Sequence, residues 1–148
     1  MQNLQSDYQT VYDKAIKLLS MRQHTKFELS KKLSARKYSA ELIQQVLNEL
    51  SEQRLLNDRQ FAEVFLDNMI RYKTFGYYML RAKLQQRGID TQTATELLEE
   101  NFSNEQELAV AQKFLNRNKN KDKIKLAQAL SRKGFRAPII SNVLKETS

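Results

Sequence analysis

Apolar side chains recur at helical spacing in three segments of the chain that align with one another without gaps. The alignment is anchored by leucines 51 and 46 residues apart, which are Leu33, Leu84 and Leu130. Each anchor follows another leucine by four residues, so that both lie on one face of a helix, and these are Leu29, Leu80 and Leu126. Further apolar positions are shared at Leu18, Met69 and Leu115, and again at Val46-Leu47, Leu97-Leu98 and Val143-Leu144. This pattern predicts a tandem array of similar helical units.

Capping residues indicate where several of the helices begin. Thr25 with Glu28 has the spacing of a capping box, and the segment from Ser103 to Gln106 repeats it. Ser39 is an N-cap candidate for a helix that ends near residue 52, and Asn57 is one for a long helix through Met69. Further helices are expected at about residues 8–20, 77–87 and 91–101. Together with those ahead of residue 134 and after residue 137, they make nine.

Glycines indicate where helices end. Gly76 interrupts the chain before the middle helix of the second segment, and Gly88 and Gly134 follow the middle helices of the second and third. Both fit the left-handed position that closes a helix. Lys37 stands at the same position in the first segment, so the first middle helix either ends differently or carries ~1–2 kcal/mol of left-handed strain. Pro138 fits a first helical turn.

The predicted fold class is therefore all-α, with three tandem three-helix units that resemble helix-turn-helix domains. The units span residues 1–52, 53–102 and 103–148, and the last is the most basic. Each is near the lower size limit for folding alone, so neighbouring units must bury apolar faces against each other. We expect an elongated, curved solenoid. Five phenylalanines on apolar faces are expected in the core: Phe61, Phe65, Phe102, Phe114 and Phe135.

Composition excludes several classes of protein. Three glycines and one proline in 148 residues are too few for a turn-rich all-β fold. The absence of cysteine excludes disulfides and thiolate metal sites, and the single histidine, His24, excludes a His-pair metal site. We expect His24 to be a solvated loop residue. No apolar run approaches the ~20 residues of a membrane helix, and no signal peptide is evident, which predicts a soluble cytoplasmic protein with no membrane partner.

Charge is distributed unevenly. The net charge is +8, of which the three predicted units carry +2, 0 and +6. The middle helices are basic, whereas the third helices of the first two units are acidic, which disfavours reading of a DNA groove by those helices. Middle helices stacked side by side would instead form a basic stripe along a nucleoprotein surface. Arg36, Arg87 and Lys133 close these helices, and the alternative of a purely structural role through the helix dipole stays open for them.

Two segments are candidates for contact with nucleic acid. Residues 117–125 carry five bases and one acid, and either contact phosphates or form a solvated loop and helix start. In residues 71–78 bases alternate with aromatics, which suits stacking on single-stranded bases, although Phe75 and one tyrosine could instead close the core. The complete candidate set is Lys31, Lys32, Arg71, Tyr72, Lys73, Tyr77, Arg81, Lys83, Arg117, Lys119, Lys121, Lys123, Lys125 and Arg132.

The chain carries no catalytic pattern. It has no glycine-rich phosphate loop, no Ser/His/Asp set and no carboxylate pair placed to shift a pKa. An enzyme is therefore not expected, and neither a cofactor nor a metal is predicted.

In order and spacing, these motifs resemble the RecX family of bacterial recombination regulators. The first unit is similar from Ala15 to Leu33, including Arg22-x-His24-Thr25-x-x-Glu28-Leu29. The second has Leu56-Asn57-Asp58-x-x-Phe61-Ala62 and Leu84-x-x-Arg87-Gly88-Ile89. The third has Leu130-x-x-Lys133-Gly134-Phe135 and Ile140-x-x-Val143-Leu144. The resemblance covers residues 11–144, and it departs from the family at Lys37 and in lacking a proline near Gly76.

The resemblance implies a regulator of homologous recombination and of the SOS response. Such a protein binds the RecA recombinase and its filament on single-stranded DNA in the helical groove, and inhibits or destabilises the filament. Non-specific duplex DNA is a further possible ligand. Two alternatives stay open on the residues alone. One is a stand-alone helix-turn-helix-like DNA-binding protein, and the other is a helical-repeat scaffold for an acidic protein partner.

Overall fold

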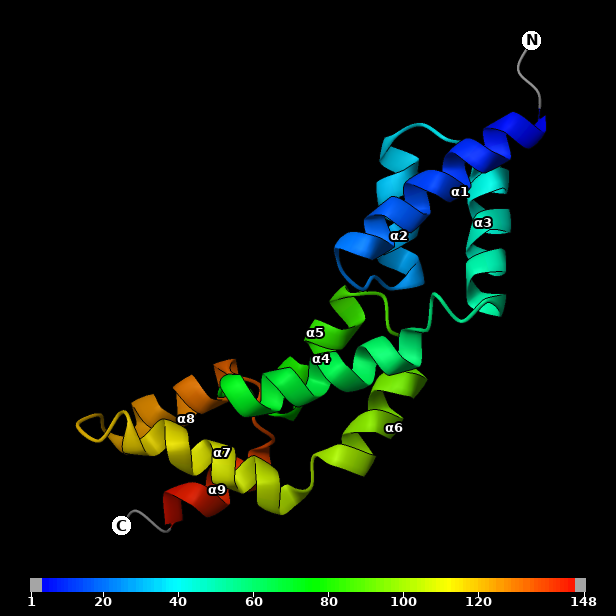
Figure 1. The fold of residues 1–148 in the computed structure, drawn as a ribbon. Helices are drawn as coiled ribbons and strands as arrows, with labels where there is room; N and C mark the ends of the chain where they lie inside the picture. The colour runs from blue at the N-terminus through cyan, green and yellow to red at the C-terminus, as the bar shows by residue number, and fades with distance from the viewer. Residues whose placement is uncertain (1–3, 146–148) are drawn as a thin grey trace. The chain divides into compact units, whose positions relative to one another are not determined.

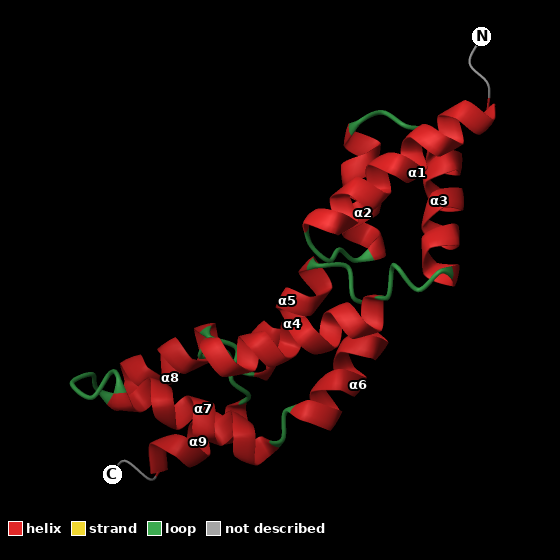
Figure 2. Cartoon of the chain, in the orientation of Figure 1, coloured by secondary structure: helices red, strands yellow, loops and turns green. Residues whose placement is uncertain are grey.

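The computed structural model describes residues 4–145, which form nine α-helices and no strand within that range (Figures 1 and 2). In chain order the helices are α1 (Leu4–Met21), α2 (Lys26–Ala35), α3 (Ala40–Glu52), α4 (Asp58–Tyr72), α5 (Tyr77–Gln86), α6 (Thr91–Asn101), α7 (Asn104–Asn116), α8 (Lys123–Arg132) and α9 (Ala137–Lys145). The predicted all-α fold class is confirmed for these residues. No helix among them is long and apolar enough to cross a membrane.

Two compact units divide the chain. Unit 1 contains residues 1–61 and 87–89, and unit 2 contains residues 62–86 and 90–148. The predicted three-unit boundaries and the curved solenoid stay predictions, and their outermost residues, 1–3 and 146–148, lie outside the described range.

The core of unit 1 lies between α1, α2 and α3, which contact one another pairwise. Leu29 and Leu33 from α2 are completely buried there, with α1 and α3 supplying further apolar side chains. The buried set is Val11, Ala15, Leu29, Leu33, Ile43, Val46, Leu47, Leu50 and Leu56. The leucine register that defined the repeat is therefore the register of the core, because its residues face inward at a spacing of four.

The core of unit 2 uses the same register. Leu80 and Leu84 of α5 and Leu130 of α8 are completely buried, and α6 and α9 pack on α5 and α8 respectively. Three of the five phenylalanines expected in the core are buried, namely Phe102, Phe114 and Phe135. Phe61 and Phe65 are only half-buried, since they lie at the edge of the apolar face of α4.

The predicted caps are confirmed. Thr25 with Glu28, and Ser103 with Gln106, form complete capping boxes at the starts of α2 and α7. Ser39 caps α3, and the Asn57 side chain accepts a hydrogen bond from the Gln60 N–H at the start of α4. The prediction for the first helix was too short, because α1 begins at Leu4 instead of near residue 8.

Lys37 adopts the left-handed conformation, so the strained one of the two outcomes expected at this position is the one that occurs. Its φ is 66°, against 95° at Gly88 and 88° at Gly134. All three middle helices therefore end in the same turn, and only the first ends with a side chain at the left-handed position. The hydrogen bond from the Lys37 N–H to the Ser34 carbonyl, at 2.8 Å, helps to hold this turn.

Replacing Lys37 with glycine is expected to raise the free energy of unfolding by about 1 kcal/mol, because the left-handed strain disappears while the exposed lysine makes no buried contact. Urea denaturation of the wild type and of Lys37→Gly measures this difference. A Lys26→Gly variant is the matched control, since Lys26 is exposed at a helical position where glycine is unfavourable. Destabilisation by both substitutions would contradict the strain at Lys37.

Candidate nucleic-acid and partner interface

The N-terminal end of α5 is where several candidate residues of unit 2 come together. The first N–H groups of a helix have no partner within it. Here the N–H of Gly76 donates to the Lys133 carbonyl at 2.9 Å, and that of Tyr78 donates to the Gly134 carbonyl at 2.8 Å. Gly76 leaves room for this approach, since a Cβ there would overlap the backbone of Phe135. The C-terminal end of α8 is thereby fixed against the start of α5.

Glu107 completes this cap from α7, and the sequence analysis missed it. Its side chain has 0% exposure, and its Oε2 accepts hydrogen bonds from the N–H groups of Tyr77 at 3.0 Å and Arg136 at 3.1 Å. Its Oε1 accepts from the Arg136 Nε at 2.7 Å. Glu107 shares a helix face with Val110, Ala111 and Phe114, and a carboxylate at such a position was the available signal of a buried ion pair.

Arg136, held by Glu107, is part of an aromatic–guanidinium cluster that we define as Tyr77, Tyr78, Arg81 and Arg136. The Arg136 guanidinium lies 4.3 Å from the centroid of the Tyr77 ring. The Arg81 guanidinium lies 5.7 Å from the Tyr77 ring and 5.3 Å from the Tyr78 ring. Tyr77 and Arg81 were predicted candidates and lie together, whereas Tyr78 and Arg136 were not predicted. Tyr78 remains 48% exposed, so the cluster can present an aromatic surface.

Phe75 lies between two other bases of unit 2. The ammonium groups of Lys83 and Lys133 are each 5.9 Å from its ring centroid. Lys133 also donates to the Thr74 hydroxyl at 3.0 Å and lies 5.6 Å from the Phe114 ring. Phe75 and Tyr77 are both half-buried, so closing the core is part of what this segment does. The base at Lys133 makes tertiary contacts in addition to any interaction with the helix dipole.

The remaining candidates before α5 are exposed. Arg71 forms an ion pair with Asp67 at 2.9 Å, one helical turn earlier on α4. Tyr72 is 77% exposed and, with Lys73, borders an open pocket of about 440 Å³ that Phe65, Asn68 and Met69 also line. Arg132, in the last turn of α8, is exposed as well.

The basic run of residues 117–125 joins α7 to α8. Arg117 closes α7, Asp122 is the N-cap of α8, and Lys123 and Lys125 lie in the first turn of α8. All five bases of the run are exposed. Bases in a first turn oppose the helix dipole, at a cost of ~0.3–1 kcal/mol, so helix stability does not explain their presence.

The expectation that the middle helices stack side by side is wrong for α5 and α8. Their hydrogen bonds join the C-terminal end of α8 to the N-terminal end of α5, so that these two helices meet end to end. The reason is that the carbonyls at the end of one helix are natural acceptors for the N–H groups at the start of another.

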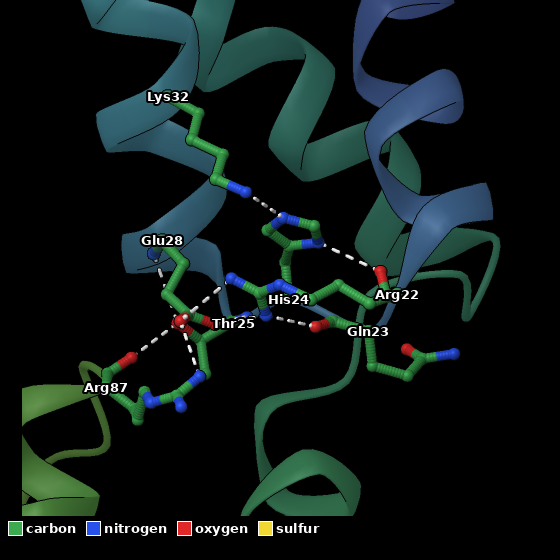
Figure 3. Close-up of polar contacts among 7 residues, drawn as sticks. All are labelled: Arg22, Gln23, His24, Thr25, Glu28, Lys32 and Arg87. Carbon is green, nitrogen blue, oxygen red and sulfur yellow. Dashed lines mark hydrogen bonds and ion pairs between the residues drawn. The ribbon is translucent and has the colours of Figure 1, made fainter.

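His24 is buried, so the prediction of a solvated residue is wrong. It is 1% exposed, and its Nδ1 lies 2.9 Å from the Arg22 carbonyl (Figure 3). Because a carbonyl can only accept, Nδ1 carries the proton, and Nε2 is left to accept from the Lys32 ammonium at 2.9 Å. Burial lowers the pKa of His24, and the charges of Arg22 and Lys32 add to this, outweighing the Arg22 carbonyl and Glu28.

Glu28 is the centre of the polar contacts in unit 1 (Figure 3). Its Oε2 lies 3.3 Å from an Arg22 nitrogen and 3.0 Å from an Arg87 nitrogen, and its Oε1 accepts from the Thr25 N–H at 3.1 Å. Burial alone would raise the pKa of Glu28, but Arg22, the Thr25 N–H and Arg87 outweigh it and lower the pKa. Arg87 therefore has an ion-pair partner, while Arg36 is exposed at the end of α2.

Of the two α2 candidates, Lys32 is tied to His24, whereas Lys31 lies 5.7 Å from the centroid of the Phe27 ring on the exposed surface. Among residues 4–145 no three His, Asp or Glu side chains are grouped so as to hold a metal ion.

Comparison with known proteins identifies similar chains. Residues 12–50 match the family model of the first three-helix domain of RecX, and residues 57–98 match that of the second. The chain is 34% identical over 144 residues to regulatory protein RecX of Chlorobium phaeobacteroides and 35% identical to that of Prosthecochloris aestuarii, with 95% of both chains covered in each case. The crystal structure of RecX from Lactobacillus salivarius has the same fold, with a TM-score of 0.87 over 97% of both chains at 24% identity.

The buried neutral state of His24 predicts that stability depends on pH. The unfolded chain takes up a proton at the ordinary pKa of 6.5, whereas the folded chain does so only at lower pH. The contribution of His24 is therefore complete above 6.5 and is lost as pH falls below it. The wild type is expected to lose free energy of unfolding between about pH 7 and 5, and His24→Gln to lose less, as measured by urea denaturation.

Glu28 does not interfere with this test. Because its pKa is lowered from 4.5, its contribution to the free energy of unfolding is lost only as the pH falls below 4.5. Equal pH dependence of the wild type and His24→Gln would show that His24 is not held neutral.

Proposed function

Since the chain belongs to the RecX family of regulatory proteins, we propose that it restrains homologous recombination and the SOS response by binding RecA and its filament on single-stranded DNA. In this proposal it lies in the helical groove of the filament and inhibits or destabilises it. In this proposal the chain acts by binding alone, which fits the naming of its relatives as regulatory proteins.

The observation that carries the DNA-binding part of the proposal is the run of exposed bases at residues 117–125. Lys123 and Lys125 weaken the start of α8 electrostatically, so their benefit must come from elsewhere. Phosphate oxygens would be attracted by these ammonium groups, whereas the Lys125 N–H already donates to the Asp122 carboxylate at 2.9 Å. A negatively charged nucleoprotein filament offers such phosphates in a regular series.

The aromatic–guanidinium cluster supports a second kind of contact. Arg136 is fixed by Glu107, and Arg81 and Arg136 together fix the ring of Tyr77. Tyr78 and Tyr72 remain exposed, and each could stack on an unpaired base for ~1–3 kcal/mol. Aromatic rings beside basic side chains suit single-stranded DNA better than duplex DNA, because the nucleobases of a duplex are already paired and stacked.

The proposed function predicts the outcome of a titration into the cognate recombinase. Wild-type protein, added well below one copy per filament protomer, is expected to reduce ATP hydrolysis that depends on single-stranded DNA. Changing Lys121, Lys123 and Lys125 to alanine is expected to weaken this inhibition. The same change should make the plot of log affinity for single-stranded DNA against log salt concentration less steep by about 2, because three phosphate contacts are lost.

A matched variant removes the same charge elsewhere, by changing Lys14, Lys17 and Lys113 to alanine, and should inhibit as the wild type does. If both triple variants lost inhibition equally, net charge rather than this surface would be responsible. No inhibition by excess wild-type protein would overturn the proposed function itself.

A further inference from the structure

The same helix-end contact occurs twice in the chain, which we call the repeat junction. In each case the left-handed glycine turn that ends one middle helix packs on the first turn of another. In unit 1 a Cβ at Gly88 would overlap the Cβ of Phe27, and in unit 2 a Cβ at Gly134 would overlap the backbone of Met79. Both glycines are therefore needed for space as well as for their positive φ.

Polar contacts repeat at the same aligned positions. The Thr25 hydroxyl donates to the Arg87 carbonyl, and the Gly76 N–H, at the aligned position, donates to the Lys133 carbonyl at 2.9 Å. A carboxylate from another helix caps each start, since Asp58 accepts from the Lys26 N–H at 2.9 Å and Glu107 from the Tyr77 N–H at 3.0 Å.

Each repeat junction consists of a turn that ends one middle helix and the first turn of another. The leucine register places one further turn and one further helix start of these kinds in the chain. The turn after α2, at Lys37, aligns with Gly88 and Gly134 and has the same positive φ. The start of α8 aligns with the starts of α2 and α5, and Ile124 stands where Phe27 and Tyr78 stand. Ile124 is 73% exposed, whereas the aligned Phe27 and Tyr78 are 49% and 48% exposed. Among residues 4–145, neither of the two forms a repeat junction.

This turn and this helix start would fit each other if they came from two copies of the chain. Two features oppose that fit. The Cβ of Lys37 occupies the space that the junction leaves empty at Gly88 and Gly134. In addition, Arg36 aligns with Arg87, but the residue that it would meet is Lys125, which stands where Glu28 binds Arg87. The start of α8 has three lysines against one aspartate in residues 121–125, so like charges would face each other.

We propose that Lys37 and Lys125 prevent the exposed start of α8 from forming a repeat junction with the turn after α2 of a second copy of this chain. Lys37 blocks it sterically and Lys125 blocks it electrostatically. This inference does not depend on RecA, because it concerns only how copies of the chain meet.

Four proteins test the proposal by sedimentation velocity over a range of concentrations at low ionic strength: the wild type, Lys37→Gly, Lys125→Glu and the double variant. The wild type and Lys125→Glu are expected to sediment as monomers, since the Cβ of Lys37 remains. Lys37→Gly is expected to associate at high concentration. The double variant is expected to associate at lower concentration than Lys37→Gly. Added salt should remove this difference, because it screens the ion pair that the Lys125→Glu substitution forms with Arg36.

Two results would overturn the proposal. One is a double variant that stays monomeric at every concentration, although circular dichroism shows that it and Lys37→Gly are folded. The other is a wild type that already associates to the same degree. Adding Ile124→Asp to the double variant should abolish association, and persistence of the oligomer in that triple variant would show that another surface is responsible.

Discussion

The structure of unit 2 depends on how the first N–H groups of α5 are satisfied. No carbonyl within α5 can accept a hydrogen bond from them, and Gly76 has no side chain with which to cap them. Their acceptors are instead the Lys133 and Gly134 carbonyls and the buried Glu107 carboxylate. Each is distant in sequence, so a local requirement for helix formation becomes a tertiary contact. That contact places Arg136 against Tyr77 and so builds the aromatic–guanidinium cluster.

Unit 1 satisfies the same requirement with different chemistry. Thr25 supplies a local cap for α2, and Glu28 collects Arg22 and Arg87 around one carboxylate. At the start of α8, Asp122 is a local cap and lysines follow it. The starts of the three aligned helices thus have different roles. The start of α2 holds an ion pair, the start of α5 a backbone contact and the start of α8 a charged surface. The function proposed for this chain uses the last of these, because only a helix start that is not covered can meet a phosphate.

Local signals in the sequence were sufficient for the helices but not for the site. The leucine register and the capping boxes at Thr25 and Ser103 predicted the elements, since each involves residues within a few positions of one another. The alignment of Lys37 with two glycines left two outcomes open, a different helix end or a positive φ, and the structure has the positive φ. The burial of His24 was missed although its polar partners, Arg22 and Lys32, are near it in the sequence, and that of Glu107 was missed because its partners are distant. Glu107 meets Arg136 29 residues away, and no local pattern specifies that distance.

Amide hydrogen exchange tests most directly whether the glycine turn at Gly134 caps α5. In the wild type, the amides of Gly76 and Tyr78 should be protected nearly as well as that of Leu84 inside the helix. In Gly134→Ala, protection at Gly76 and Tyr78 should fall while Leu84 stays protected, because the added Cβ separates the two helix ends. Rapid exchange of Gly76 and Tyr78 in the wild type, or unchanged protection in Gly134→Ala, would contradict the account.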